Sequence, residues 1–209
     1  MATCALVAAG DFNSEHFTKS DAIGAFDEVY AVDGGYAFLD AIGREPDVVV
    51  GDFDSLGYVP QSQRLHRFPL HKDKSDLELA SDQLKLDGFD EVVVYGAIGG
   101  RLDHTIANLQ MACSFAEDGL IVTFIALDCA IRIVVGPSVY HLPDLESGTV
   151  SVFSAVDCAK GVTEQGLEYP LENADLTNRT TLGVSNELIG EPASIEVSEG
   201  TLYVFHPLS

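Results

Sequence analysis

The chain has 209 residues, and its 33 acidic and 11 basic side chains give a formal net charge of −22. A charge of this sign repels polyanions, so nucleic acid and anionic membrane surfaces are poor partners. No stretch approaches the eighteen uninterrupted apolar residues of a transmembrane helix, and no basic residue precedes the first apolar run as in a signal peptide. We therefore expect a cytoplasmic protein with a core of ordinary size, since 46% of its residues are hydrophobic.

The four cysteines are scattered along the chain. Cys4, Cys113, Cys129 and Cys158 form no C-x-x-C pair. Such spacing is unlike that of zinc sites and disulfide frameworks. We expect buried free thiols.

Strand and helix patterns alternate through the first part of the chain. Short valine-rich runs at 3–9, 28–32, 47–50 and 91–95 have the composition of strands buried on both faces of a parallel sheet. Between them, 35–43, 76–88 and 103–119 have helical spacing and end in glycine. This order predicts an α/β domain with a mainly parallel sheet over residues 1–135.

The pattern changes near residues 136–144. From there to the end of the chain, short alternating runs are separated by Gly, Pro and Asn, without a convincing helix. Residues 136–209 are therefore predicted to form an all-β, sandwich-like domain.

The stretch "VVVGDFDSL" places Asp52 and Asp54 directly after a buried strand. Two carboxylates about 5 Å apart repel by roughly 3 kcal/mol at an effective dielectric constant of 20. Solvent, a basic neighbour or a metal must offset this repulsion if both remain ionised. Magnesium, which binds one or two carboxylates together with substrate phosphates, matches the pair.

Polar residues and glycines follow two other predicted strands. "AVDGGY" places Asp33 before Gly34 and Gly35, and "YGAIGGRLDHTIANL" leads from a strand into a helix near Asp103. Glycines permit close approach to a ligand, helix N-termini favour anions, and Arg101 offers a donor fork for phosphate. His104 and Asn108 share one helical face. Because ligands bind at the carboxyl ends of parallel strands, these stretches predict a phosphate site.

Four of the eleven basic residues lie between 64 and 76: Arg64, Arg67, Lys72 and Lys74. Concentrating scarce positive charge just before a helix favours an anion site. An ion-paired loop is the alternative, since Asp73 and Asp76 belong to the same segment.

In their order and spacing, "DGG", "PDVVVGDFDSL", "HKDKSDLE" and "GAIGGRLDHTIANL" resemble the thiamine pyrophosphokinase family, with weaker support from "SNE" at 185–187. The resemblance implies transfer of a pyrophosphoryl group from ATP to the hydroxyl of thiamine, with Mg²⁺, by a homodimer whose active sites lie between subunits.

The resemblance also implies roles for individual residues. Asp52 and Asp54 would hold the metal, with Asp33 near them and the triphosphate. Nucleotide contacts would come from the following residues: Gly34, Gly35, Lys72, Ser75, Gly99, Gly100, Arg101, Asp103, His104 and Asn108. Asp76 would lie where nucleotide and thiamine meet, and we choose it to orient the attacking alcohol or accept its proton, which makes Asp76, Asp54 and Arg101 the catalytic candidates. Ser185 and Asn186 would belong to the thiamine-binding edge of the second domain.

Two alternatives stay open. A phosphatase of the haloacid dehalogenase type also has a D-x-D motif after a strand, and Asp52 would then be phosphorylated, although Gly51 separates it from the strand. A non-catalytic protein that senses nucleotide or metal could keep the same residues.

Overall fold

The structure is a computed structural model that describes residues 1–53, 56–60, 62, 64–67 and 75–209. It forms two compact units. The first comprises Met1–Met111 and Gly119–Leu127, and the second comprises Ala112–Asp118 and Asp128–Ser209. None of the helices within these described residues has the length and apolar character that crossing a membrane requires.

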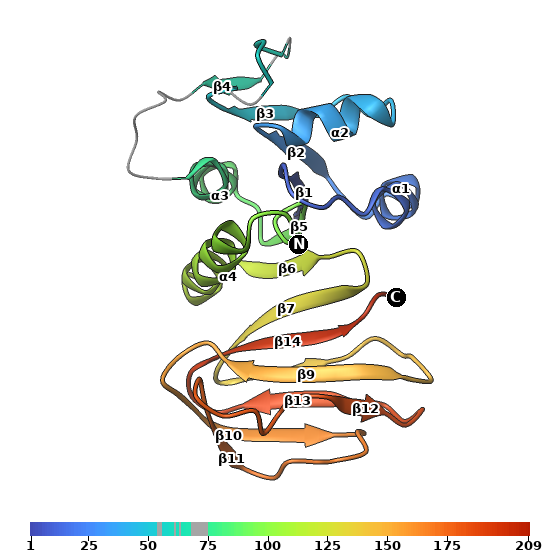
Figure 1. Cartoon of the computed structure of the whole chain (residues 1–209), viewed down its shortest axis with the longest axis vertical. Helices are drawn as coiled ribbons and strands as arrows, with labels where there is room; N and C mark the ends of the chain where they lie inside the picture. The colour runs from blue at the N-terminus through green and yellow to red at the C-terminus, as the bar shows by residue number, and fades with distance from the viewer. Residues whose placement is uncertain (54–55, 61, 63, 68–74) are drawn as a thin grey trace. The chain divides into compact units, whose positions relative to one another are not determined.

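The first unit contains the predicted parallel sheet (Figure 1). Its strands lie in the order β4-β3-β2-β1-β5-β6, and every neighbouring pair is parallel. The strands are β1 (Thr3–Val7), β2 (Glu28–Val32), β3 (Val48–Gly51), β4 (Leu65–Arg67), β5 (Glu91–Tyr95) and β6 (Ile121–Ile125). The central strands are almost fully buried because helices cover both faces of the sheet, which explains their continuous apolar runs.

Figure 1 shows α1 (Ser14–Ala22) and α2 (Gly35–Ala41) on one face of this sheet and α3 (Asp76–Asp87) on the other. The fourth helix, α4 (Leu102–Glu117), is divided between the two units after Met111. Gly43, Gly88 and Gly119 follow α2, α3 and α4 with positive φ angles. These glycines end the helices as the sequence predicts.

Strand β6 (Ile121–Ile125) was not predicted although its run is apolar, and two further elements of the first unit were missed because they lack such a pattern. Helix α1 buries only Phe17, so the sequence lacks an apolar stripe, and the helix is defined instead by Asn13, whose side chain accepts a hydrogen bond from the His16 amide. Strand β4 has only three residues, none fully buried, and lies at the edge of the sheet. Neither element has the hydrophobic periodicity on which the sequence prediction depends.

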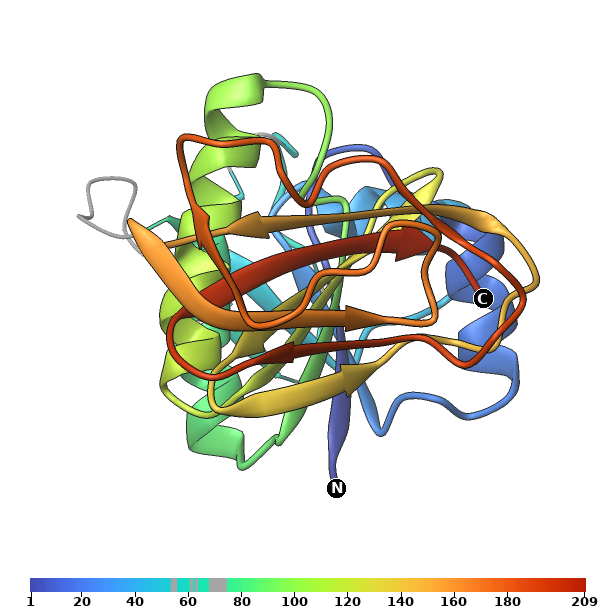
Figure 2. The ribbon, with the colours of Figure 1, turned by 90° about the horizontal axis from the view of Figure 1, so that it is seen from below.

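The second unit is the predicted β sandwich. Its strands form two antiparallel groups, β12-β9-β14-β7 and β11-β10-β13-β8. The strands are β7 (Cys129–Val135), β8 (Ser138–His141), β9 (Gly148–Ser154), β10 (Cys158–Gln165), β11 (Ala174–Thr177), β12 (Asn186–Leu188), β13 (Ser194–Val197) and β14 (Thr201–Pro207). Figure 2 shows the orange and red strands running alongside one another. Val150, Ile195 and Leu202 are among the side chains that fill the core between the two groups.

All four cysteines are free, as predicted. The prediction that all are buried is wrong for two of them. Cys4 and Cys113 are buried, whereas Cys129 and Cys158 are only partly so. Each partly exposed thiol belongs to the first residue of a strand, at the end of its sheet.

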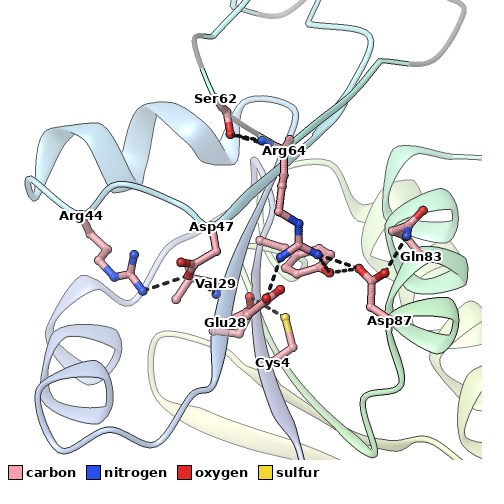
Figure 3. A network of polar contacts seen from close by, with 11 residues as sticks. Cys4, Glu28, Val29, Arg44, Asp47, Ser62, Arg64, Gln83 and Asp87 are labelled. Atoms are coloured by element: carbon pink, nitrogen blue, oxygen red, sulfur yellow. Dashed lines mark hydrogen bonds and ion pairs between the residues drawn. The ribbon is translucent and has the colours of Figure 1, made fainter.

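Arg64 stabilises the edge of the parallel sheet by ion pairing (Figure 3). It precedes β4, and its guanidinium lies 2.6 Å from Glu28 Oε1 and 3.2 Å from Asp87 Oδ2. Asp87 also accepts a hydrogen bond from the buried Tyr30 hydroxyl. The ion-paired alternative is therefore correct for Arg64, which lies at the amino ends of the strands, away from the predicted anion site. His71, Lys72 and Lys74 lie outside the described residues.

We expect Arg64→Ala to lower the free energy of unfolding by about 1–2 kcal/mol, because it leaves two partly buried carboxylates without their cation. Lys19→Ala is the matched control, since the Lys19–Glu15 pair is mostly exposed and its loss should destabilise the protein far less. Urea denaturation measures both variants. Equal destabilisation would contradict a structural role for the Arg64 network.

Candidate active site

One cavity of about 500 Å³ in the first unit collects most of the predicted site residues. It is bordered by the segments that follow β1, β2, β3 and β5 and by the first turns of α3 and α4. The predicted residues that line it are Asp33, Asp52, Ser75, Asp76, Gly99, Gly100, Arg101, His104 and Asn108. Gly34, Gly35 and Asp103 are adjacent in sequence to these residues but do not line the cavity.

The sheet topology explains the position of the cavity. From β1 the chain adds β2, β3 and β4 on one side and then adds β5 and β6 on the other side, so the order of strands switches between β1 and β5. In open parallel sheets such a switch point leaves a crevice at the carboxyl ends of the strands. Gly10 and Gly96 let the two segments approach closely: a Cβ atom on Gly10 would lie 2.6 Å from the Gly96 carbonyl oxygen, and one on Gly96 would lie 2.2 Å from the Ala8 carbonyl oxygen.

The acidic side of the cavity is formed where β2 and β3 end. The Asp33 amide donates to the Val50 carbonyl (2.8 Å), and a Cβ atom on Gly51 would lie 3.1 Å from Asp33 Cα. Gly51 is the last residue of β3, so Asp52 follows the strand directly and is not separated from it as expected, and a side chain on Gly51 would crowd Asp33. Both Asp33 (φ 46°) and Phe53 (φ 65°) have left-handed backbone conformations, and Phe53 is buried. Such strained conformations cluster at functional sites. Asp54 lies outside the described residues, as does Lys72.

Gly35 begins α2, and the structure gives it a packing function. A Cβ atom on Gly35 would lie 2.0 Å from the Val7 carbonyl oxygen, so only glycine allows α2 to contact β1 this closely. Gly34 is the residue before the helix, and no side chain caps it.

The opposite side of the cavity favours anions. Ser75 caps α3 by accepting a hydrogen bond from the Glu78 amide, and α4 begins directly after Arg101. The first amides of both helices carry partial positive charge. Asp103 accepts two hydrogen bonds from Arg101, at 3.2 Å from Nε and 2.6 Å from Nη2. The Arg101 guanidinium lowers the pKa of Asp103 to about 2, so Asp103 is ionised at neutral pH and orients the arginine.

Asn108 and Thr105 hold the glycine-rich turn in place. The Asn108 side chain donates to the Ala97 carbonyl (2.8 Å), and the Thr105 hydroxyl donates to the Gly99 carbonyl (3.4 Å). Asn108 thus supports the turn as well as lining the cavity. His104 lines the cavity from an exposed position on the same helix.

Ser185 and Asn186 lie in the second unit, beside a separate cavity of about 420 Å³. Asn186 lines it, together with the following residues: Glu168, Tyr169, Pro170, Leu171, Leu182 and Val184. Asn186 is buried, and its side chain donates to Glu164 Oε2 (2.7 Å) and the Tyr169 carbonyl (2.8 Å). Ser185 has a left-handed conformation, and its amide donates to the Ser151 hydroxyl.

Sequence reasoning missed the segment after β1. Ala8, Ala9 and Gly10 line the first cavity, and the Asp11 carboxylate packs against Gly99 so closely that a Cβ atom there would lie 2.0 Å from Asp11 Oδ2. The signal that could have revealed this segment is the glycine in "AAGDF", directly after the first predicted strand. Glu164 was also missed, because nothing in its local sequence distinguishes a buried glutamate from an exposed one.

We expect Gly35→Ala to destabilise the protein by about 2–3 kcal/mol or more, since the added methyl group meets backbone of β1 that cannot move aside. Gly43→Ala, at the other end of α2, meets no atom within 4 Å, so only its positive φ of 72° should cost about 1 kcal/mol. Thermal and urea denaturation compare the two. An equal loss would show that α2 does not depend on this close contact.

Burial raises the pKa of Glu164 to about 7, above the ordinary value of 4.5. Between these two pH values the folded chain holds a proton on Glu164 that the unfolded chain has released. The stabilisation that comes from this proton is therefore full at low pH and is lost as the pH rises through about 7. Denaturation of the wild type and Glu164→Gln between pH 5 and 8 isolates the effect. The stability of the wild type relative to the variant should fall by about 2–3 kcal/mol over this range. A constant difference would mean that the carboxyl group titrates normally.

Comparisons with known proteins agree across both units. The model of the thiamin pyrophosphokinase catalytic domain matches residues 22–124, and that of the thiamin pyrophosphokinase vitamin B1 binding domain matches residues 139–202. The thiamine pyrophosphokinase of Bacillus subtilis (strain 168) is 29% identical over 180 residues, covering 82% of this chain and 83% of that protein.

Solved structures show the same fold. The crystal structure of the Bacillus subtilis thiamine pyrophosphokinase has a TM-score of 0.83 and 25% identity, with 99% of each chain covered. The yeast thiamin pyrophosphokinase has a TM-score of 0.75 at 12% identity, covering 100% of this chain and 86% of that one, which is evidence for the fold alone. Because both domain models match in order, this chain belongs to the thiamine pyrophosphokinase family, a family of transferases.

Proposed function

We propose that the chain catalyses transfer of a pyrophosphoryl group from ATP to the hydroxyl of thiamine, giving thiamine diphosphate and AMP. Residues 1–135 bind the nucleotide and residues 136–209 bind the vitamin. The observation that carries the proposal is the 500 Å³ cavity, which is lined by carboxylates from two strand ends, by the N-termini of two helices and by Arg101. Neither the phosphatase nor the non-catalytic alternative is favoured by the comparisons.

The acidic residues of the cavity fit a magnesium ion. Asp33 and Asp52 both line it, and carboxylate oxygens are the ligands that Mg²⁺ takes, together with phosphate oxygens and water. Within the part of the chain that the structure describes, no three His, Cys, Asp or Glu side chains are grouped as a metal site, and Asp54 lies outside that part. We assign the ion to Asp52 and Asp54, with Asp33 beside them. When bound, Mg²⁺ neutralises negative charge on the phosphates.

The chain's own residues position the phosphates and the alcohol. Backbone amides at Gly99, Gly100 and the start of α4 provide donors for phosphate oxygens, and Arg101 adds a charged donor fork held in place by Asp103. We assign Lys72 to the phosphates from the sequence. Ser75 lies at the start of α3, directly before Asp76. Asp76 lies in the first turn of α3 and lines the cavity.

In the proposed reaction, the hydroxyl oxygen of thiamine bonds to the β-phosphorus of ATP. The bond from that phosphorus to the oxygen of the α-phosphate breaks, and AMP leaves. Asp76 orients the hydroxyl group and accepts its proton. The catalytic residues are thus Asp76, Asp54 and Arg101. Phosphoryl transfer of this kind depends on positioning and charge neutralisation more than on covalent catalysis, which agrees with a cavity made of carboxylates, amides and one guanidinium.

We also assign the protein to the cytoplasm and to a homodimer whose active sites lie between subunits. Four free thiols are consistent with a reducing compartment. Large exposed apolar side chains occur on both units, including Leu102 and Ile106 on α4 and Tyr169 and Leu182 in the second unit. Patches of this kind are typical of surfaces that another chain covers.

The test is to incubate purified protein with ATP, Mg²⁺ and thiamine and to separate the products by chromatography. We expect thiamine diphosphate and AMP. Thiamine monophosphate with ADP would refute pyrophosphoryl transfer, and phosphate release without thiamine would favour the phosphatase.

In the same assay, Asp52→Asn and Asp54→Asn should each lower kcat by about a hundredfold or more, because each removes charge from the metal site. Asp175→Asn, an exposed carboxylate of the second unit, is the matched control and should leave the rate unchanged. Circular dichroism verifies folding. Near-normal turnover in both variants would contradict the assignment of the metal to Asp52 and Asp54.

A further inference from the structure

The second unit contains a buried carboxyl group that the proposed reaction does not use. Glu164 lies on β10 and is 1% exposed, the one carboxylate so enclosed among the residues that the structure describes. Its amide donates to the Leu171 carbonyl, and its Oε2 accepts from Asn186. Its Oε1 is buried without a hydrogen-bond partner among the described residues. Enclosing a carboxyl group this way costs stability, so its retention calls for a function.

Among the residues that the structure describes, the Glu164 side chain makes its one hydrogen bond with the amide group of Asn186. That amide donates to Glu164 and to the Tyr169 carbonyl, and it accepts from the Tyr169 and Glu187 amides at 3.0 and 2.9 Å. An asparagine side chain has two N–H donors and two acceptor lone pairs, so its capacity is fully used. Asn186 therefore cannot also bind a ligand through its side chain unless it gives up one of these bonds.

Asn186 instead fixes Tyr169, since both backbone polar groups of Tyr169 are bonded to the one amide. The Tyr169 side chain is 66% exposed and lines the second cavity with Pro170, Leu171 and Leu182. An aromatic face among aliphatic side chains suits a flat, positively charged heteroaromatic ligand. Glu164 adds a side-chain acceptor that holds the amide in this orientation, since a rotated Asn186 would place its oxygen against both the carboxylate and the Tyr169 carbonyl.

We propose that Glu164 is a positioning residue for thiamine binding: by fixing the Asn186 amide, it holds Tyr169 in the orientation in which its ring contacts the vitamin. The inference rests on the proposed function and adds a route from a buried residue to the substrate-binding wall. It assigns Asn186 a supporting role and gives the direct contact to Tyr169.

The test is steady-state kinetics of Glu164→Met, Glu164→Gln, Tyr169→Ala and the Glu164→Met/Tyr169→Ala double variant. Methionine removes the acceptor but keeps the volume, and we expect it to raise the KM for thiamine about tenfold, with the KM for ATP and kcat at saturating thiamine within about twofold of the wild type. Glutamine keeps an acceptor and should restore the KM to within about threefold. Glu196→Met, an exposed carboxylate on the neighbouring β13, is the matched control and should change nothing.

The double variant separates positioning from general damage. If Glu164 acts through Tyr169, the double variant should be no worse than Tyr169→Ala, because the two changes remove one contact. The inference would be overturned if the two changes raised the KM for thiamine additively, or if Glu164→Met left that KM unchanged. It would also be overturned if Glu164→Met raised the KM for ATP as much as the KM for thiamine. Tyr169→Ala changes an exposed side chain and so remains informative if Glu164→Met does not fold, and an unchanged KM for thiamine there also overturns it. If the wild type turns over thiamine while these variants behave like it, only this inference fails; absence of wild-type turnover refutes the proposed function as well.

Discussion

Mutual repulsion of carboxylates is the interaction on which the active site depends. Asp33, Asp52 and Asp76 line one cavity, and Arg101 is the arginine that faces it among the described residues. Two carboxylates about 5 Å apart repel by roughly 3 kcal/mol at an effective dielectric constant of 20. Carboxylates and helix N-termini that line one cavity suit the magnesium-bound phosphates of the proposed reaction, because the cation offsets this repulsion and the helix amides favour the phosphates.

The fold gathers these charges by close backbone contacts at a few glycines. Gly51 lets the end of β3 lie against Asp33, Gly35 lets α2 lie against β1, and Gly96 lets the segment after β5 lie against Ala8. Each contact leaves too little room for a Cβ atom, so each glycine is required by geometry as much as by any ligand. This gives a physical reason for the glycine in "VVVGDFDSL": it sets the distance between two acidic turns.

The sequence was most informative where hydrophobic pattern and glycine punctuation coincide. The buried strands β2 and β5 match their predicted ranges, and α2, α3 and α4 end at or near the predicted glycines. Helix α1 and strand β4 could not be predicted because one buries a single residue and the other none. For the same reason Arg64 was read as part of an anion site, since its partners Glu28 and Asp87 are distant in sequence and only the fold brings them together.

The candidate site was predictable at the strand ends and poorly predictable elsewhere. Asp33, Asp52 and Arg101 follow strands in the sequence, and parallel pairing alone brings them to one edge. Asn186 was recognised from a motif, but its four hydrogen bonds join it to Glu164 on β10, to Tyr169 and to Glu187, and no local sequence pattern records the contacts with Glu164 and Tyr169.

The most direct test of the central claim is a crystal structure of the protein with Mn²⁺ in place of Mg²⁺ and a non-hydrolysable ATP analogue, with the metal located by anomalous scattering. We expect the anomalous peak in the cavity of the first unit, within coordination distance of Asp52 and of the analogue's phosphate oxygens. A peak bound elsewhere, or phosphates that avoid this cavity while the acidic side chains contact only solvent, would contradict the account.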